Sequence, residues 1–262
     1  MKRLAVLAHH EPHGHVHGYV LQHLRALRQV AGRVVLVSSS PLTAAARAEA
    51  AAVCDRVLLR ANVGYDFAAW RDALAGESLD LDALILTNDS VLGPFADYAQ
   101  LFARMHEADF WGATDSHEYT WHVQSYFLVT SRRVLASEAF RRFWAGVLDY
   151  RDKVQVVRSY ELGWSSYLVD QGFRGAAVVP FETVAGHLER EARFPWSRPK
   201  HLERRSLLVC YPEELIRLGA PFVKRRSLIE LKQHGTLGQL RALAEQVGYP
   251  QACIDEALEM PV

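Results

Sequence analysis

Short apolar runs alternate with amphipathic segments along the first 180 residues of the chain. The apolar runs have the length of buried strands, and the segments between them carry apolar residues at helical spacing. Strands are expected at residues 3–8, 33–37, 56–59, 82–87, 110–114, 124–129 and 176–179. Helices are expected at residues 19–30, 43–53, 66–75, 94–105, 133–148 and 160–171. This alternation predicts an α/β fold with a Rossmann-like, mostly parallel central sheet and helices on both faces.

The regular pattern weakens after about residue 185. Residues 187–205 carry many charges, and two short helices are expected to finish the chain. No repeat or low-complexity linker separates the two parts. We therefore predict an α/β domain over residues 1–185 and a helical and irregular C-terminal extension over residues 186–262, packed on the same domain.

Composition narrows the class of protein. Thirty basic and thirty acidic residues cancel, which argues against a protein that binds nucleic acid, because such a protein carries a basic surface. Cys54, Cys210 and Cys253 lack metal-type spacing and suit buried thiols in a reducing cytoplasm. No apolar run approaches the roughly 18 residues of a transmembrane helix. We expect a cytoplasmic protein, and peripheral association with the inner face of the plasma membrane stays open.

The most informative polar cluster is Asn88-Asp89-Ser90, directly after the buried run 82–87. It should lie at the carboxyl end of a strand, the edge of an open α/β sheet where ligands bind. Asp89 is a candidate ligand of a hard cation such as Mg²⁺, which prefers oxygen ligands. The alternative is an Asx-turn without chemistry.

A second polar loop carries Asn62, Gly64 and Asp66 between a strand and a helix. Gly64 permits a positive φ or close backbone approach to a ligand. The functional interpretation is that these residues contact the base or sugar of a nucleotide. The alternative is a tight turn with a helix cap at Asp66.

The region around residues 110–127 combines titratable and aromatic groups beyond a strand end. Asp115 follows the strand, and four further residues there are candidates for contacting a sugar: Trp111, His122, Gln124 and Tyr126. This composition favours a sugar-binding cleft over a polar loop. Glu161, expected just before a helix, is a candidate general base. Its alternative role is a charge that complements the helix dipole.

Five histidines lie at positions 9, 10, 13, 15 and 17. Imidazoles at such spacing can bind Zn²⁺, which raises the hypothesis of a metal-dependent hydrolase, although neither an HExxH motif nor a cysteine partner accompanies them. The alternatives are contact with a pyrophosphate or simple exposure to solvent. His9 and His10 are retained as candidates for binding a donor substrate.

Several longer strings resemble the rhamnan synthesis protein F family of bacterial glycosyltransferases. They occur in order through most of the chain: Asn62-Val-Gly-Tyr-Asp-Phe-Ala-Ala-Trp70, Asn88-Asp-Ser-Val-Leu-Gly-Pro-Phe95, Asp109-Phe-Trp-Gly-Ala-Thr114, His122-Val-Gln-Ser-Tyr-Phe127, Tyr160-Glu-Leu-Gly163 and Pro221-Phe-Val-Lys224. The first two strings are much more specific than any single generic motif.

The resemblance implies a glycosyltransferase A-type fold, with residues 1–185 as the nucleotide-sugar-binding and catalytic domain. It also implies transfer of a sugar, commonly rhamnose from a dTDP-sugar, to a lipid-linked oligosaccharide of a growing cell-surface polysaccharide such as O-antigen, part of lipopolysaccharide, or rhamnan. A non-catalytic, sugar-nucleotide-binding component of a polysaccharide assembly complex is the alternative.

In that fold an Asp-x-Asp motif usually ends the fourth strand and holds Mg²⁺ or Mn²⁺ on the diphosphate. This chain has one acid there, Asp89. The resemblance therefore leaves two possibilities open. Asp89 alone helps to hold a metal ion, or Lys224 or an arginine of the C-terminal segment neutralises the diphosphate without one. The expected reaction is direct displacement with inversion, with Glu161 preferred slightly over Asp115 as the base.

Overall fold

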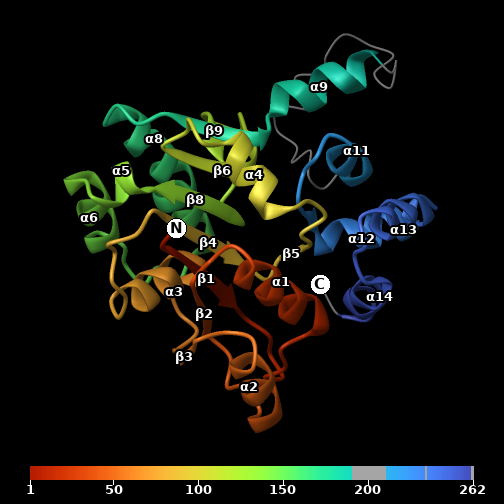
Figure 1. The fold of residues 1–262 in the computed structure, drawn as a ribbon, viewed down its shortest axis with the longest axis horizontal. Helices are drawn as coiled ribbons and strands as arrows, with labels where there is room; N and C mark the ends of the chain where they lie inside the picture. Colours follow the sequence, from red (N-terminus) through yellow and green to blue (C-terminus); the bar gives the residue numbers. More distant parts are fainter. Residues whose placement is uncertain (191–210, 234, 261–262) are drawn as a thin grey trace.

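An eight-stranded sheet runs through the centre of the molecule (Figure 1). The computed structural model describes residues 1–190, 211–233 and 235–260. The strands of the sheet are β1 (Arg3–His9), β2 (Arg33–Ser38), β3 (Arg56–Leu59), β4 (Ala83–Asn88), β6 (Phe110–Ser116), β7 (His122–Val123), β8 (Phe127–Ser131) and β9 (Gly175–Val179). Their order is β3-β2-β1-β4-β8-β6-β7, with β9 beside β6.

Most neighbouring strands in this sheet are parallel. β3, β2, β1 and β4 run the same way, β9 is parallel to β6, and β8 is antiparallel to both β4 and β6. Because β8 runs opposite to both of its neighbours, β6 points the same way as β4, and so does β9. The predicted α/β fold with a mostly parallel central sheet is confirmed.

The strand expected at residues 124–129 is wrong in its first half. Residues 124–126 form a turn between β7 and β8, in which the Gln124 N–H donates to the Thr114 carbonyl (3.0 Å). The Tyr126 carbonyl accepts a hydrogen bond from the Thr87 hydroxyl (2.8 Å). These bonds hold the turn against the end of the sheet. The aromatic run therefore has the composition of a strand, but only its second half pairs with a neighbouring strand.

Helices cover both faces of the sheet, as predicted. They are α1 (Gly18–Arg28), α2 (Ala44–Ala51), α3 (Tyr65–Leu74), α4 (Tyr98–Arg104), α5 (Arg132–Leu135), α6 (Glu138–Ala145), α7 (Lys153–Val156), α8 (Leu162–Asp170) and α9 (Phe181–Arg190). The helix expected at residues 133–148 is two helices, because Ser137 caps a new helix by accepting from the Phe140 N–H (3.1 Å).

Glu161 does not precede a helix, which corrects the expectation from the sequence. A π-helical segment, η1 (Val157–Glu161), joins α7 to α8, so the helical stretch begins at Lys153 and Glu161 lies inside it. Asp152 caps the stretch by accepting from the Val154 N–H (2.9 Å). The interpretation of Glu161 as a charge at a helix N-terminus is therefore wrong.

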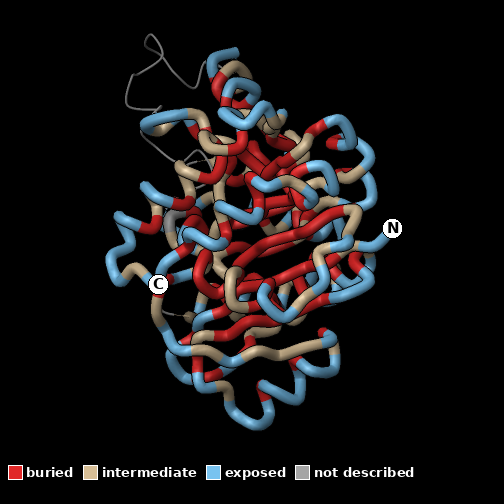
Figure 2. Tube along the Cα trace, turned by 90° about the vertical axis from the view of Figure 1, so that its left-hand side faces the viewer, coloured by how far each residue is buried: buried red, intermediate tan, exposed pale blue. Residues whose placement is uncertain are grey.

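Each face of the sheet has its own apolar core, and the buried strands lie between them (Figure 2). On one face α1, α2, α4 and α9 supply Leu24, Ala50, Leu101 and Leu188. On the other face α3, α6 and α8 supply Trp70, Phe140 and Trp164. Alternate residues of the strands feed the two cores, as a sheet covered on both faces requires.

The described part of the C-terminal segment shares the first of these cores. Its elements are α11 (Pro212–Arg217), β10 (Val223–Lys224), α12 (Arg225–Gln233), α13 (Leu237–Gln246) and α14 (Gln251–Glu259). Three helices thus follow β10 where the sequence analysis expected two. Of the charged stretch at 187–205, the first four residues belong to α9 and the rest lie outside the described residues, as does Cys210.

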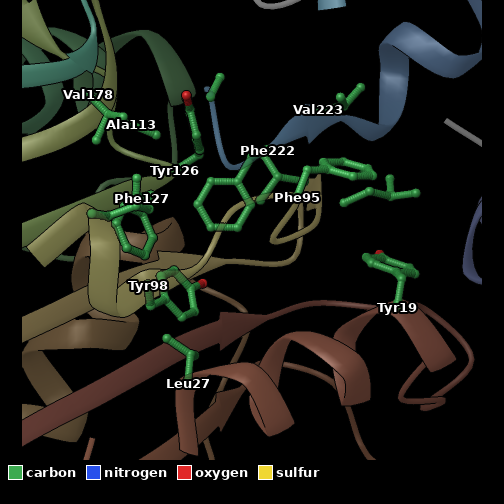
Figure 3. Close-up of a cluster of buried hydrophobic side chains, with 14 of the residues drawn as sticks. Tyr19, Leu27, Phe95, Tyr98, Ala113, Tyr126, Phe127, Val178, Phe222 and Val223 are labelled. Carbon is green, nitrogen blue, oxygen red and sulfur yellow. The ribbon is translucent and has the colours of Figure 1, made fainter. Parts of the chain in front are cut away.

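The C-terminal segment is joined to the sheet end through β10, which pairs antiparallel with β5 (Val91–Leu92). Phe222 is fully buried and packs on Phe127 and Tyr98 (Figure 3). A Cβ at Gly93 would lie 2.3 Å from the Pro221 carbonyl oxygen. The strings Asn88–Phe95 and Pro221–Lys224 therefore form one packed unit.

No helix in the described ranges is long and apolar enough to cross a bilayer.

Candidate functional site

The carboxyl ends of β1, β2 and β4 meet at one edge of the sheet. The His10 N–H donates to the Asp89 carboxylate (Oδ2, 2.8 Å), and the Ser39 N–H donates to the His9 carbonyl (2.9 Å). Parallel strands place their carboxyl ends at the same edge, and the polar residues after them come together for that reason.

Two neighbouring hollows open at this edge, one of about 410 Å³ and one of about 640 Å³. We call the larger one the histidine hollow. Its volume is 640 Å³, and its lining includes His9, His10, Asp89, Ser90, Arg225 and Glu256. The residues come from β1, the loop after it, the end of β4, and helices α12 and α14 of the C-terminal segment. Segments far apart in the sequence thus build one site.

Asp89 is one of the acids that line the histidine hollow. Burial raises the pKa of Asp89 to about 7, the nearby Asp66 carboxylate adds to the rise, and the His10 N–H and Arg225 oppose it. The Tyr19 hydroxyl donates to the Asp89 carbonyl (3.0 Å), which fixes the backbone there. Near neutral pH this carboxyl is therefore balanced between its charged and protonated forms, so a bound cation or proton donor changes its charge readily.

Asn88 ties the end of β4 to the start of α3. Its amide Nδ2 donates to Asp66 (Oδ2, 2.7 Å), and its Oδ1 accepts from the Ser90 N–H (3.1 Å) and hydroxyl (2.6 Å). Burial raises the pKa of Asp66; the Asn88 bond lowers it, and the Glu161 carboxylate raises it. Asp66 and Asn88 therefore connect the histidine hollow to the side of the sheet where Glu161 lies.

Glu161 lines a third hollow, of 370 Å³, which we call the glutamate hollow. Its lining includes Ser116, His122, Gln124, Lys153 and Arg158. The Glu161 carboxylate (Oε1) accepts from the Ser125 N–H at a long 3.4 Å. One carboxylate oxygen has no hydrogen bond among the described residues, so Glu161 is placed to accept a proton from a bound hydroxyl.

Two of the predicted sugar contacts border the same hollow. His122 donates from Nδ1 to the Thr120 carbonyl (2.9 Å), which leaves Nε2 as an acceptor in its neutral form. The Gln124 carbonyl oxygen (Oε1) accepts from the Thr114 hydroxyl (2.6 Å), which leaves the amide NH₂ for a ligand. Both side chains offer polar atoms suited to sugar hydroxyls.

Trp111 and Tyr126 lie elsewhere. Trp111 is four residues upstream of Asp115 on β6, about 13 Å at the usual rise of a strand, and packs in the core on Phe102 and Phe127. Tyr126 is buried, and its hydroxyl bonds the Thr114 hydroxyl (2.7 Å). The structure therefore brings neither ring to the surface of either hollow.

Asp115 holds two structural hydrogen bonds. Its Oδ2 accepts from the Trp121 indole (2.8 Å), and its Oδ1 accepts from the Phe181 N–H at the start of α9 (2.5 Å). It is not part of the lining of the glutamate hollow. Of the two candidate bases, Glu161 is the one that faces an open space.

Asn62 and Gly64 border the hollow of 410 Å³ beside the histidine hollow, together with Tyr65 and Arg151. The Asn62 amide lies 3.5 Å from His10 Nε2 and so adjoins the histidine hollow. Gly64 has φ +75°, and an added Cβ would lie 2.4 Å from the Ala68 Cβ. The need for glycine here is explained by the turn into α3, in agreement with the structural alternative.

Lys224 lies close enough to Glu161 and Asp66 to interact with both charges. Its ammonium lies 5.7 Å from the centre of the Tyr126 ring. Burial lowers the pKa of Lys224, while Glu161 and Asp66 raise it. A half-buried cation beside these acids is suited to neutralising an anionic ligand that reaches this point.

The residues at this edge do not form a ready metal site. Within the described ranges no three His, Cys, Asp or Glu side chains cluster as a metal-binding group. The histidine loop is shaped instead by Glu11, whose Oε2 accepts from the N–H groups of His13 (2.9 Å) and His15 (2.8 Å). Asp89 already accepts the His10 N–H. The zinc hypothesis therefore has no geometric support here, and the donor set does not fit a preformed Mg²⁺ site.

Several charged residues that line the histidine and glutamate hollows were not singled out from the sequence, among them Lys153, Arg158, Arg225 and Glu256. Arg225 directly follows Lys224, and its N–H donates to the Ser90 carbonyl (3.0 Å). Its adjacency to the Pro-Phe-Val-Lys string was a usable signal. The other three lie on helical segments, where the hydrophobic period predicts the apolar face but not which hollow the polar residues meet.

Fold and site together define a mixed α/β protein with polar hollows at the carboxyl edge of its sheet. The sequence model of the family described as "Rhamnan synthesis protein F" matches residues 34–260. The chain belongs to this family.

Curated relatives match part of the chain. One is "Uncharacterized protein y4gN" of Sinorhizobium fredii (strain NBRC 101917 / NGR234), 28% identical over 65% of this chain and 46% of its own length. Another is "Virulence protein VirA" of Vibrio anguillarum (strain ATCC 68554 / 775), 30% identical over 50% of this chain and 44% of its own length. The chain thus spans about half the length of these relatives.

Among solved structures, a cytidylyltransferase from Leptospira borgpetersenii serovar Hardjo-bovis (strain JB197) shares 10% of its residues, with a TM-score of 0.39. The match covers 91% of this chain and 97% of that one. At this TM-score the likeness supports no inference about function.

Proposed function

We propose that the protein is a glycosyltransferase that moves a sugar, rhamnose in our assignment, from a dTDP-sugar to a growing cell-surface polysaccharide such as O-antigen or rhamnan. Membership of the rhamnan synthesis family supports a role in polysaccharide biosynthesis. The observation that carries the proposal is the pair of hollows: the acid Asp89 lies in one, and the acid Glu161 lies in the other.

The donor is assigned to the histidine hollow. Its 640 Å³ suit a nucleotide-sized ligand. Arg225 and Lys224 supply positive charge for the diphosphate, and the neighbouring Asn62 supplies an amide for base or sugar. His10 adds a ring at the same opening. Asp89 and Asn88 are then placed near the sugar of the donor, where a carboxylate and an amide hold hydroxyls.

The acceptor saccharide is assigned to the glutamate hollow. There Glu161 takes the proton from the acceptor hydroxyl, whose oxygen attacks the anomeric carbon of the donor. The new carbon–oxygen bond forms as the bond from that carbon to the diphosphate breaks, with inversion. The diphosphate leaves with the electron pair, and Lys224 stabilises the charge that develops on it.

Mg²⁺ or Mn²⁺ remains a prediction of the resemblance. In our proposal the cationic side chains neutralise the diphosphate, and no step depends on a metal ion. If donor affinity falls more than tenfold when EDTA replaces Mg²⁺ in the buffer, that part of the proposal is wrong.

The test is release of dTDP from dTDP-rhamnose in the presence of a lipid-linked rhamnan or O-antigen acceptor. We expect Glu161→Gln to lower the rate by at least about 100-fold, the low end for losing a general base, with donor affinity changed less than about threefold. The matched control is Asp115→Asn, which should keep most of the rate in the fraction that folds.

The outcome also separates the main alternative. If dTDP-rhamnose binds to the wild type but no acceptor preparation releases dTDP, the protein is a non-catalytic sugar-nucleotide-binding component. Equal rates for the wild type and Glu161→Gln would remove Glu161 from the reaction.

A further inference from the structure

A carboxylate from the C-terminal helix α14 occupies the N-terminus of α1. Glu256 accepts from the Gly18 N–H (Oε2, 2.6 Å) and contacts His17 Nδ1 (Oε1, 3.0 Å). The contact is close, because a Cβ on Gly18 would lie 2.8 Å from Oε2. The Glu256 side chain is 36% exposed and lines the histidine hollow. Solvent and ligands can therefore reach this carboxylate.

The start of α1 is built to hold an anion. A helix N-terminus presents N–H groups without partners and a partial positive charge. α1 has 11 residues, no acidic residue in its first turn and no capping side chain of its own. His17 adds a ring nitrogen beside the Gly18 N–H, and it stacks on Tyr19, whose hydroxyl reaches the Asp89 carbonyl. Glu256 thus fills a helix N-terminus, a kind of place where phosphate groups bind in many proteins.

A second residue of the same hollow has an unused polar atom. His9 is 3% exposed, and its Nε2 has no hydrogen-bond partner of normal geometry, although the His15 carbonyl lies close to the ring. Its Nδ1 pairs with the Ser38 hydroxyl (3.0 Å), whose oxygen accepts from the Ser40 N–H (3.1 Å).

That arrangement allows a tautomer with the ring proton on Nε2. The Ser38 oxygen accepts from Ser40, and its own hydrogen can point to His9 Nδ1, which then needs no proton. Burial lowers the pKa of His9 to about 4, so the ring is neutral at pH 7. In this tautomer Nε2 is a buried N–H donor on a side chain that lines the hollow, without a hydrogen bond of normal geometry among the described residues.

We propose that the N-terminus of α1, with His17 and His9, is a phosphate subsite, and that Glu256 occupies it until a phosphate of the ligand takes its place. The ligand class is a nucleoside diphosphate, and this choice rests on the proposed function, which assigns the donor to the histidine hollow. Displacing Glu256 removes the two polar contacts that link α14 to the start of α1. Glu256 is then an internal competitor that couples ligand binding to release of the C-terminal helix.

The test is calorimetric titration of the full chain with dTDP, and in separate arms with inorganic pyrophosphate and inorganic phosphate. The variant Glu256→Gln removes the competing charge. The matched control is Glu259→Gln, because Glu259 also lines the hollow and its loss removes the same charge from the same helix. Melting curves of all three proteins check that they are folded.

We expect Glu256→Gln to bind dTDP at least about fivefold more tightly than the wild type, the low end of usual coupling between sites. Glu259→Gln should change the affinity less than twofold. Hydrogen exchange of residues 251–259 in the wild type should speed up when dTDP is added. This second measurement does not depend on how well either variant folds.

Equal affinities for Glu256→Gln and Glu259→Gln, or unchanged exchange in α14, overturn the phosphate subsite while leaving the proposed function intact. If pyrophosphate or phosphate binds more tightly to Glu256→Gln but dTDP does not bind, the subsite stands and the nucleotide donor is wrong. If none of the three anions binds to any of the proteins, the subsite and the donor assignment both fail.

Discussion

The two acids that the sequence left nearly equal, Asp115 and Glu161, differ in what their oxygens already hold. Both oxygens of Asp115 accept structural hydrogen bonds, one of them from Phe181, 66 residues later in the chain. Glu161 makes one long bond and faces a hollow. Sequence could name both residues as acids near strand and helix ends. It could not weigh them, because a partner 66 residues away is known only once the chain has folded.

At this scale Asp89 gives a prediction that depends on pH. Burial raises its pKa from an ordinary value of 3.8 to about 7. Between those values the folded protein keeps a proton that the unfolded chain has lost, so stability falls as pH rises through this window. Asp89→Asn should therefore be more stable than the wild type at pH 8, by on the order of 2 kcal/mol for this half-buried group, and nearly equal to it at pH 4.

Urea unfolding in metal-free buffer from pH 2 to pH 8 measures the effect. Asp55 is the control of opposite sign, because hydrogen bonding to Arg28 lowers its pKa. Asp55→Asn should lose stability at pH 8 and lose less as pH falls below 4. A constant difference between Asp89→Asn and the wild type across the range would show that the Asp89 carboxyl is not desolvated.

At the scale of elements, the strands of the first half and the faces of the helices were predictable, because hydrophobic period decides them. The errors fall where tertiary contacts decide. The run 124–129 is aromatic enough for a strand, yet its first three residues turn to bond Thr87 and Thr114. Glu161 was expected at a helix start, but the helical stretch begins at Lys153 and passes through a π-helical turn. Such turns often occur at functional sites.

The turn into α3 gives a prediction about an element boundary. Gly64 combines φ +75° with a position where a Cβ meets the Ala68 Cβ at 2.4 Å. Gly172 has nearly the same backbone, φ +79°, but nothing within 4 Å of an added Cβ. Gly172→Ala should therefore cost about 1 kcal/mol from the backbone alone. Gly64→Ala should cost at least about 3 kcal/mol, because overpacking adds to the same strain.

Chemical denaturation of the two variants checks this comparison. Equal losses would mean that the space around Gly64 yields easily, and that the crowding at this turn plays no part in its need for glycine.

At the scale of the whole molecule, the C-terminal segment is part of the site as well as of the core. Phe222 packs on Phe127 and Tyr98 (Figure 3). Arg225 and Glu256 bring charge to the histidine hollow. An extension packed on the first domain, with Lys224 or an arginine as a possible cation for the diphosphate, could be predicted from the sequence. That this arginine is Arg225, and that Glu256 also lines the hollow, could not. The helical period of α12 and α14 shows that these helices have an apolar face, not which pocket their polar residues meet.

The topology of the sheet also accounts for the positions of the histidine and glutamate hollows. β8 is antiparallel to its neighbours, so its start lies at the same edge as the ends of β4 and β6. The turn before β8 then carries Gln124 beside Glu161, while the end of β4 carries Asp89. The reversed strand β8 thus brings Gln124 to the glutamate hollow at the same sheet edge where β4 brings Asp89 to the histidine hollow.

The most direct test of this account is a crystal structure of the protein with dTDP-rhamnose. We predict the diphosphate in the histidine hollow, within hydrogen-bond distance of Arg225 or Lys224, and the anomeric carbon of the sugar directed toward Glu161. A nucleotide bound away from Asp89, or a sugar whose anomeric carbon points away from the glutamate hollow, would contradict it.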